Sequence, residues 1–179
     1  MKKTIKILVV SVLALSVSLF ALSIGFQISG IYINTTPSLP VGFYKVVDEP
    51  ILSGAYVAFC PPKNEVFDMA RDRSYINRGD CPGGYGLLLK RVFAQSGDTV
   101  SIDQAGIYVN GKHLPNSTQL TADAEGQPLP QYRLQTVLDD SEYLLLSDLN
   151  PQSFDARYFG LIARDQIQQV VRPIFTWSH

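Results

Sequence analysis

The sequence is short of the residues that many hydrolytic enzymes use. Its 179 residues include two histidines, His113 and His179, and two cysteines, Cys60 and Cys81. His113 follows a predicted turn and His179 is the last residue, so neither is expected to be held beside a nucleophile, which argues against a Ser-His-Asp triad. The histidine-glutamate pattern of metal hydrolases and a glycine-rich phosphate loop are also absent from the sequence. We therefore expect no bound metal and no cofactor.

The charge balance excludes nucleic acid as the main partner. Fifteen Lys and Arg residues face sixteen Asp and Glu residues, which gives a formal net charge of −1, and the basic residues are scattered along the chain. A nucleic-acid-binding protein usually gathers basic residues on one face. The length predicts one domain with a core of its own.

One long stretch without charge stands near the N-terminus. Lys2, Lys3 and Lys6 precede it, and from Ile7 to Phe26 no residue is charged. About 20 such residues would span ~30 Å as a helix, the thickness of a bilayer core. We expect residues 1–30 to form a transmembrane anchor with a cytoplasmic N-terminus and residues 31–179 to form the extracytoplasmic domain. A cleaved signal peptide, with "ALS" at 21–23 as the cleavage site, is the alternative; the anchor is favoured because a signal peptide's apolar region is usually ~7–15 residues long.

Beyond residue 30 the pattern favours a mostly β, antiparallel domain. Apolar, β-branched or aromatic runs of strand length occur at 41–47, 55–59, 86–93, 99–102 and 143–146. Asn110-Gly111 after residues 107–109 predicts a hairpin, because this pair supplies the positive φ angles of a type I′ turn. Only short helical turns are expected, near 65–69 and 164–168.

Two segments are expected to be surface excursions. Residues 61–80 are rich in charge and lie between the two cysteines. In an exported domain a Cys60–Cys81 disulfide could close this loop, with two free thiols as the alternative. Residues 115–131 have the polar, Pro- and Gly-containing composition of a long loop.

Ser38 and Lys90 are the candidate reactive pair. Pro37 and Pro40 restrict the backbone around Ser38, so its hydroxyl is held in a stiff, extended stretch. Lys90 lies in the apolar run "GLLLKRVF", where strand alternation would let Lys90 point inward while Arg91 points out. A buried lysine has a lowered pKa and can act as a base, whereas most lysines in strands reach out into water instead.

Three ordered motifs resemble the signal peptidase I family of membrane-bound Ser-Lys proteases. They are "TPSLPVGFY", "LLLKRVFAQSGDTV" and "SFDARYFG". The "LP-x-GFY" continuation is most similar to the TraF-type branch of conjugative transfer peptidases. Leu39 replaces the methionine usual after the nucleophile, which makes a general housekeeping signal peptidase less favoured.

The resemblance implies a role for each matched residue. Ser38 matches the nucleophile and Lys90 the general base; Thr36, with the Ser38 N–H, matches the oxyanion hole. Ser153 falls where a serine orients the lysine. Asp155 and Arg157 match a buried pair that supports the site, and a purely structural salt bridge is the alternative for them.

The expected function follows from the same resemblance. It implies a serine endopeptidase in the bacterial inner membrane, with a periplasmic catalytic domain that contacts lipid and processes exported or membrane-inserted precursors through an acyl-enzyme. A conjugative pilin precursor, matured by hydrolysis or by cyclisation, is the substrate that it implies. The alternatives are a general type I signal peptidase and a non-catalytic anchored scaffold of a secretion or conjugation apparatus.

Overall fold

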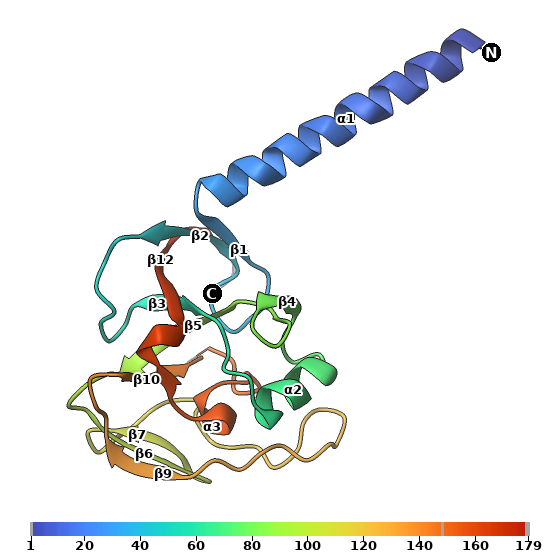
Figure 1. Cartoon of the computed structure of the whole chain (residues 1–179). Coiled ribbons are helices and arrows are strands. Elements are labelled where there is room, and N and C mark those ends of the chain that lie inside the picture. Colours follow the sequence, from blue (N-terminus) through green and yellow to red (C-terminus); the bar gives the residue numbers. More distant parts are fainter. Residues whose placement is uncertain (1, 148, 178–179) are drawn as a thin grey trace.

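Two antiparallel β-sheets form the body of the domain in the computed structural model, which describes residues 2–147 and 149–177, with the backbone alone at residues 2, 4, 21–24 and 26–28 (Figure 1). The larger sheet has the order β1 (Ile31–Asn34), β2 (Gly42–Val47), β12 (Ile167–Thr176), β3 (Tyr56–Phe59), β5 (Leu88–Ala94), β10 (Glu142–Leu146) and β11 (Ile162–Ala163). The smaller sheet has the order β8 (Lys112–His113), β7 (Gly106–Val109), β6 (Thr99–Asp103) and β9 (Leu134–Val137). The remaining elements are α1 (Lys2–Ile28), α2 (Glu65–Asp72), β4 (Arg78–Cys81), α3 (Ala156–Phe159) and the 3₁₀ turn η1 (Arg164–Gln166).

The expected mostly β, antiparallel fold is confirmed. Each strand expected from the sequence overlaps one of the strands β2, β3, β5, β6 and β10. At the predicted hairpin between β7 and β8, Asn110 and Gly111 have φ angles of 51° and 77°, as a type I′ turn requires. The helical turn near 65–69 is part of α2, whose N-cap Asn64 accepts a hydrogen bond from the Phe67 N–H.

The C-terminal part differs from the sequence-based expectation. The turn expected at 164–168 ends with η1 at Gln166, and the chain continues as β12, the ten-residue strand between β2 and β3. β12 pairs with β3 only through residues 167–171 and with β2 through residues 170–176. Pro173 therefore lies where β12 has a single neighbouring strand. Proline, which has no backbone N–H to donate, is tolerated at such an edge but not in the middle of a sheet.

The hydrophobic core lies between the sheets and the two short helices. Phe67 of α2 packs against Phe159 of α3 with ring centroids 5.0 Å apart, and Phe159 also packs against Phe59 at the end of β3, within the same buried cluster. A disulfide joins Cys60 to Cys81 across a Cα–Cα distance of 5.4 Å, so the charged excursion 61–80, which contains α2, is closed at its base. Residues 115–131 contain neither helix nor strand, as expected for a loop.

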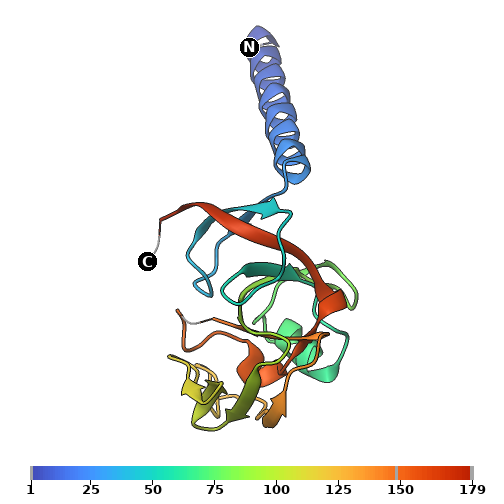
Figure 2. The ribbon, with the colours of Figure 1, turned by 90° about the vertical axis from the view of Figure 1, so that its left-hand side faces the viewer.

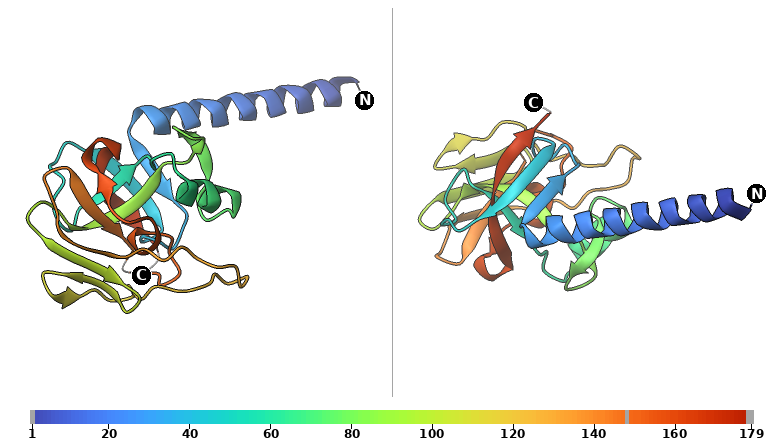
Figure 3. Two further views of the ribbon diagram at one scale, coloured as in Figure 1. Left: turned by 60° about the horizontal axis from the view of Figure 1, so that its bottom comes forward. Right: turned by 90° about the horizontal axis from the view of Figure 1, so that it is seen from above.

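Helix α1 projects from the edge of the larger sheet, and its contacts with the domain include those with β1 (Figures 2 and 3). Large apolar side chains along it, such as Leu8, Val12 and Phe20, are exposed. Over the residues that the structure describes, no helix is long and apolar enough to cross a membrane. The expected transmembrane anchor stays a prediction.

Candidate active site

Ser38 lies in the loop of residues 35–41 between β1 and β2, which we call the Ser38 loop. The two strands pair up to Asn34 and Gly42, so the loop closes a hairpin at the edge of the larger sheet. Ser38 is half-buried, and the next residue, Leu39, is anchored in a small apolar cluster that includes Tyr44. The backbone carbonyl of Ser38 accepts a hydrogen bond of 2.6 Å from the Ser147 hydroxyl. The Ser38 loop is thus held by Ser147, just after β10, and by the apolar cluster around Leu39, as well as by its prolines.

Lys90 is buried in the middle of β5. Its exposed fraction is 4%, and Val92 and Ala94 are buried on the same face, while the half-buried Arg91 lies over the rings of Tyr56 and Phe93. The expected division of the two cations between the faces of the strand is confirmed. Burial lowers the pKa of Lys90 from 10.5 to about 8, with Asp155 raising it and Arg157 lowering it to smaller extents. Lys90 is therefore mostly charged at neutral pH and becomes a neutral amine as the pH rises through about 8, well below the range of an ordinary lysine.

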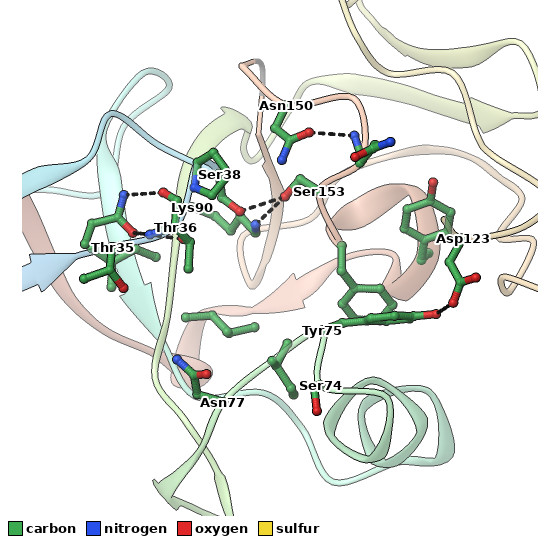
Figure 4. A pocket seen from close by; sticks show the side chains of 18 of the residues that line it. Thr35, Thr36, Ser38, Ser74, Tyr75, Asn77, Lys90, Asp123, Asn150 and Ser153 are labelled. Atoms are coloured by element: carbon green, nitrogen blue, oxygen red, sulfur yellow. Dashed lines mark hydrogen bonds between the residues drawn. The ribbon is translucent and has the colours of Figure 1, made fainter. Parts of the chain in front are cut away.

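Ser153 joins the two residues. The Lys90 Nζ donates to Ser153 Oγ over 2.7 Å, and Ser153 Oγ lies 3.0 Å from Ser38 Oγ (Figure 4). Among the described residues no hydrogen bond connects Ser38 directly to Lys90. The three side chains, which come from segments far apart in the sequence, form a continuous hydrogen-bonded chain in which Ser153 is the middle member.

Asp155 and Arg157 form a fully buried ion pair behind Ser153. Both side chains are 0% exposed, and the Arg157 Nε and Nη2 donate to the two carboxylate oxygens over 2.8 Å. Arg157 also donates to the backbone carbonyls of Asn150, Pro151 and Ser153, while Asp155 accepts from the Ser147 N–H. The pair thereby fixes the segment that carries Ser153. Its contacts give it a supporting position, with no contact to Ser38 itself.

Thr36 has a different environment from the one expected. Its side chain is exposed, and its hydroxyl donates to Asn34 Oδ1 over 3.0 Å. Asn34 and Ser147 are site residues that the motifs did not indicate. Ser147 depends on a contact with a segment far away in the sequence, and Asn34 on the way in which the hairpin folds the loop back over it. A single asparagine or serine at a strand end carries no local signal.

A pocket of about 530 Å³ opens beside Ser38 and Lys90. One wall comes from the apolar residues Leu87–Leu89, at the start of β5 and just before it. The other comes from residues 74–77 after α2 and from residues 120–129 of the long loop. Tyr75 donates a hydrogen bond to Asp123 across this pocket, at the end away from Ser38 (Figure 4). His113 is exposed on β8 in the smaller sheet and does not line this pocket, and His179 lies outside the described residues.

Comparisons of the sequence with a family model and with known proteins point to the same family. A family model described as "Signal peptidase, peptidase S26" matches residues 1–177. A plasmid transfer protein TraF of Escherichia coli is 45% identical over 99% of this chain and 100% of its own length, and a second one is 49% identical over 84% and 85%. A conjugal transfer protein TraF of Agrobacterium fabrum is 35% identical over 84% and 85%. The crystal structure of a signal peptidase I from Enterococcus faecalis aligns with a TM-score of 0.39 at 19% identity, over 70% of this chain and 99% of that one.

The chain therefore belongs to the signal peptidase family, peptidase S26, a family of serine peptidases. Within that family, the two Escherichia coli relatives place it in the TraF-type branch.

Proposed function

We propose that this protein is a serine endopeptidase in which Ser38 is the nucleophile and Lys90 the general base. The observation that carries the proposal is the hydrogen-bonded chain from Ser38 Oγ through Ser153 Oγ to the buried Lys90 Nζ. A hydroxyl is a weak nucleophile until a neighbouring base accepts its proton, and a buried lysine with a pKa of about 8 can do so.

The geometry supports a defined proton path. As Ser38 Oγ attacks the substrate carbonyl, its proton passes to Ser153 Oγ, and the Ser153 proton passes to the neutral Lys90 amine. The Lys90 ammonium then protonates the leaving amine as the C–N bond breaks, which leaves an acyl group on Ser38. Among the described residues, the Ser38 backbone N–H has no hydrogen-bond partner, so it is available to the oxyanion of the tetrahedral intermediate.

The relatives support a proposal for the substrate class. Their names, plasmid transfer and conjugal transfer protein TraF, support a peptidase role in conjugation. We propose a conjugative pilin precursor as the substrate, with α1 anchoring the enzyme in the bacterial inner membrane and the β domain in the periplasm. The exposed apolar side chains of α1 favour this placement. An anchor of this kind would confine enzyme and membrane-inserted substrate to one plane and raise their effective concentration.

The proposal is tested with the detergent-solubilised full chain and the pilin precursor of the same transfer system, followed by intact mass. A loss of C-terminal mass from the precursor is expected with the wild type and not with Ser38→Ala. A further deficit of one water would show that the pilin's own N-terminal amine captured the acyl group, which gives a cyclic product. A wild type that leaves both this precursor and signal-peptide substrates intact would favour a non-catalytic scaffold.

A further inference from the structure

The side chain of Asn34 clamps the Ser38 loop. Asn34 is the last residue of β1 and is 6% exposed. Its Nδ2 donates to three backbone carbonyls of the loop, those of Thr36 at 2.9 Å, Leu39 at 3.0 Å and Pro40 at 3.2 Å. An amide NH₂ has two protons, so at least one of them is shared between two carbonyls. These carbonyls lie on both sides of Ser38 in the chain, and one side chain therefore fixes both arms of the loop.

The other end of the same amide holds Thr36. Asn34 Oδ1 accepts from the Thr36 backbone N–H at 3.2 Å and from the Thr36 hydroxyl at 3.0 Å. The orientation of the amide is determined by its partners, because three carbonyls require the nitrogen on one side and an N–H requires the oxygen on the other. A carboxamide oxygen only accepts, so the single proton of the Thr36 hydroxyl points at Asn34.

We infer that Asn34 is a positioning residue for Ser38 and that the Thr36 hydroxyl belongs to this clamp instead of the oxyanion hole. The inference rests on the proposed function. A hydroxyl stabilises an oxyanion only by donating its proton, and the proton of Thr36 is committed to Asn34 Oδ1. The preorganised oxyanion donor is then the free N–H of Ser38, whose direction the clamp sets by holding the loop on either side.

The other supports of the loop do not duplicate this role. The Tyr44 hydroxyl donates to the Pro40 carbonyl over 2.7 Å, and the Ser147 hydroxyl donates to the Ser38 carbonyl over 2.6 Å. Each makes one bond to the loop and neither contacts Thr36, whereas Asn34 makes five. Ser147→Ala is therefore a control that removes one bond to the loop, together with the 3.3 Å bond that Ser147 Oγ accepts from the Asn150 N–H, and leaves the Thr36 hydroxyl in place.

A double-mutant cycle tests the inference, with kcat and KM measured on the full chain and an internally quenched peptide that covers the cleavage site of the pilin precursor. The variants are Thr36→Val, Asn34→Ala and the double variant. The clamp predicts that Thr36→Val lowers kcat about tenfold, the equivalent of one neutral hydrogen bond, with KM little changed. In the Asn34→Ala background, where the hydroxyl has no partner to lose, the same substitution should change kcat less than about twofold, because the two residues act as one unit.

A direct oxyanion role gives a different result. Losing one oxyanion donor costs about 10²–10³-fold in kcat, and the loss would recur with Asn34 present or absent. That additive outcome would overturn the inference. If Ser38→Ala is inactive and the effects of the two substitutions add, the clamp is rejected and the proposed function stands. If Ser38→Ala is active, the proposed function is rejected.

The melting temperature provides a second readout in case Asn34→Ala does not fold. The clamp predicts that Thr36→Val lowers the melting temperature by about 2–4 °C, because a loop bond is lost in a domain of this size. Ser147→Ala, which loses one loop bond of the same kind, is expected to give a similar decrease. An unchanged melting temperature in Thr36→Val, together with a large loss of kcat, would contradict the clamp.

Discussion

The burial of Lys90 makes a quantitative prediction about stability and pH. In the unfolded chain the amine has its ordinary pKa of 10.5, whereas in the folded protein burial lowers the pKa to about 8. At 1.36 kcal/mol per pKa unit, this difference corresponds to about 3 kcal/mol. Lys90→Met keeps the length of the side chain and removes the charge. The free energy of unfolding of the variant minus that of the wild type should therefore be larger at pH 7 than at pH 10.5.

The direction of the pH dependence follows from proton binding. Below pH 8 both states of the wild type carry the proton on Lys90, so the full penalty of a buried ammonium is present. Between pH 8 and 10.5 the unfolded state binds the proton and the folded state does not, so the wild type gains stability as the pH rises. Methionine does not titrate. The free energy of unfolding of Lys90→Met minus that of the wild type should thus fall by about 3 kcal/mol across this window.

Urea unfolding of the detergent-solubilised full chain at several pH values between 7 and 10.5 measures this difference. Lys45→Met, at an exposed lysine of β2, corrects for the general effect of losing one positive charge. A difference between Lys90→Met and the wild type that stays constant with pH, after this correction, would refute the lowered pKa. It would also remove the physical basis for Lys90 as a base.

Three further results are expected. Asp155→Asn leaves the buried charge of Arg157 without its partner and should lower the free energy of unfolding by about 3–5 kcal/mol. Glu49→Gln, in an exposed pair, should lower it by at most about 1 kcal/mol. Equal losses in urea unfolding would mean that the buried pair stabilises the fold no more than the exposed one. The double variant Cys60→Ser/Cys81→Ser should be about 3 kcal/mol less stable, because the disulfide closes the excursion between β3 and β4, and a melting curve identical to that of the wild type would argue against the bridge. In the wild type, kcat/KM should rise with pH and level off above about 8, as the neutral form of the base accumulates; a rate independent of pH from 6 to 10 would contradict this.

The parts of the fold that could be predicted from the sequence are those fixed by local pattern. Strand β5 is an apolar run whose alternation correctly divided Lys90 from Arg91, and the hairpin at Asn110 follows from turn chemistry. Strand β12 was missed because its sequence contains glutamines and Pro173, which weaken a strand pattern. Its place between β2 and β3 is set by long-range pairing, and no local window contains that information.

The candidate site divides in the same way. Ser38, Lys90 and Ser153 were found because their motifs resemble those of a known family, and the structure brings their side chains together. Asn34 was not found, since its function arises from where the hairpin places it against the carbonyls of the loop. The expected oxyanion role of Thr36 rested on its position in the motif that resembles the family, and a matched position does not reveal which acceptor takes the proton of its hydroxyl.

The most direct test of the Ser38–Lys90 pair is the single-turnover rate at which the purified full chain processes the pilin precursor. The variants are Ser38→Ala and Lys90→Met, with Ser74→Ala as the control, since Ser74 lines the same pocket outside the hydrogen-bonded chain. We expect the first two to lose at least about 10³-fold and the control to stay within a few fold of the wild type. Processing by Ser38→Ala or Lys90→Met at the wild-type rate would contradict the account.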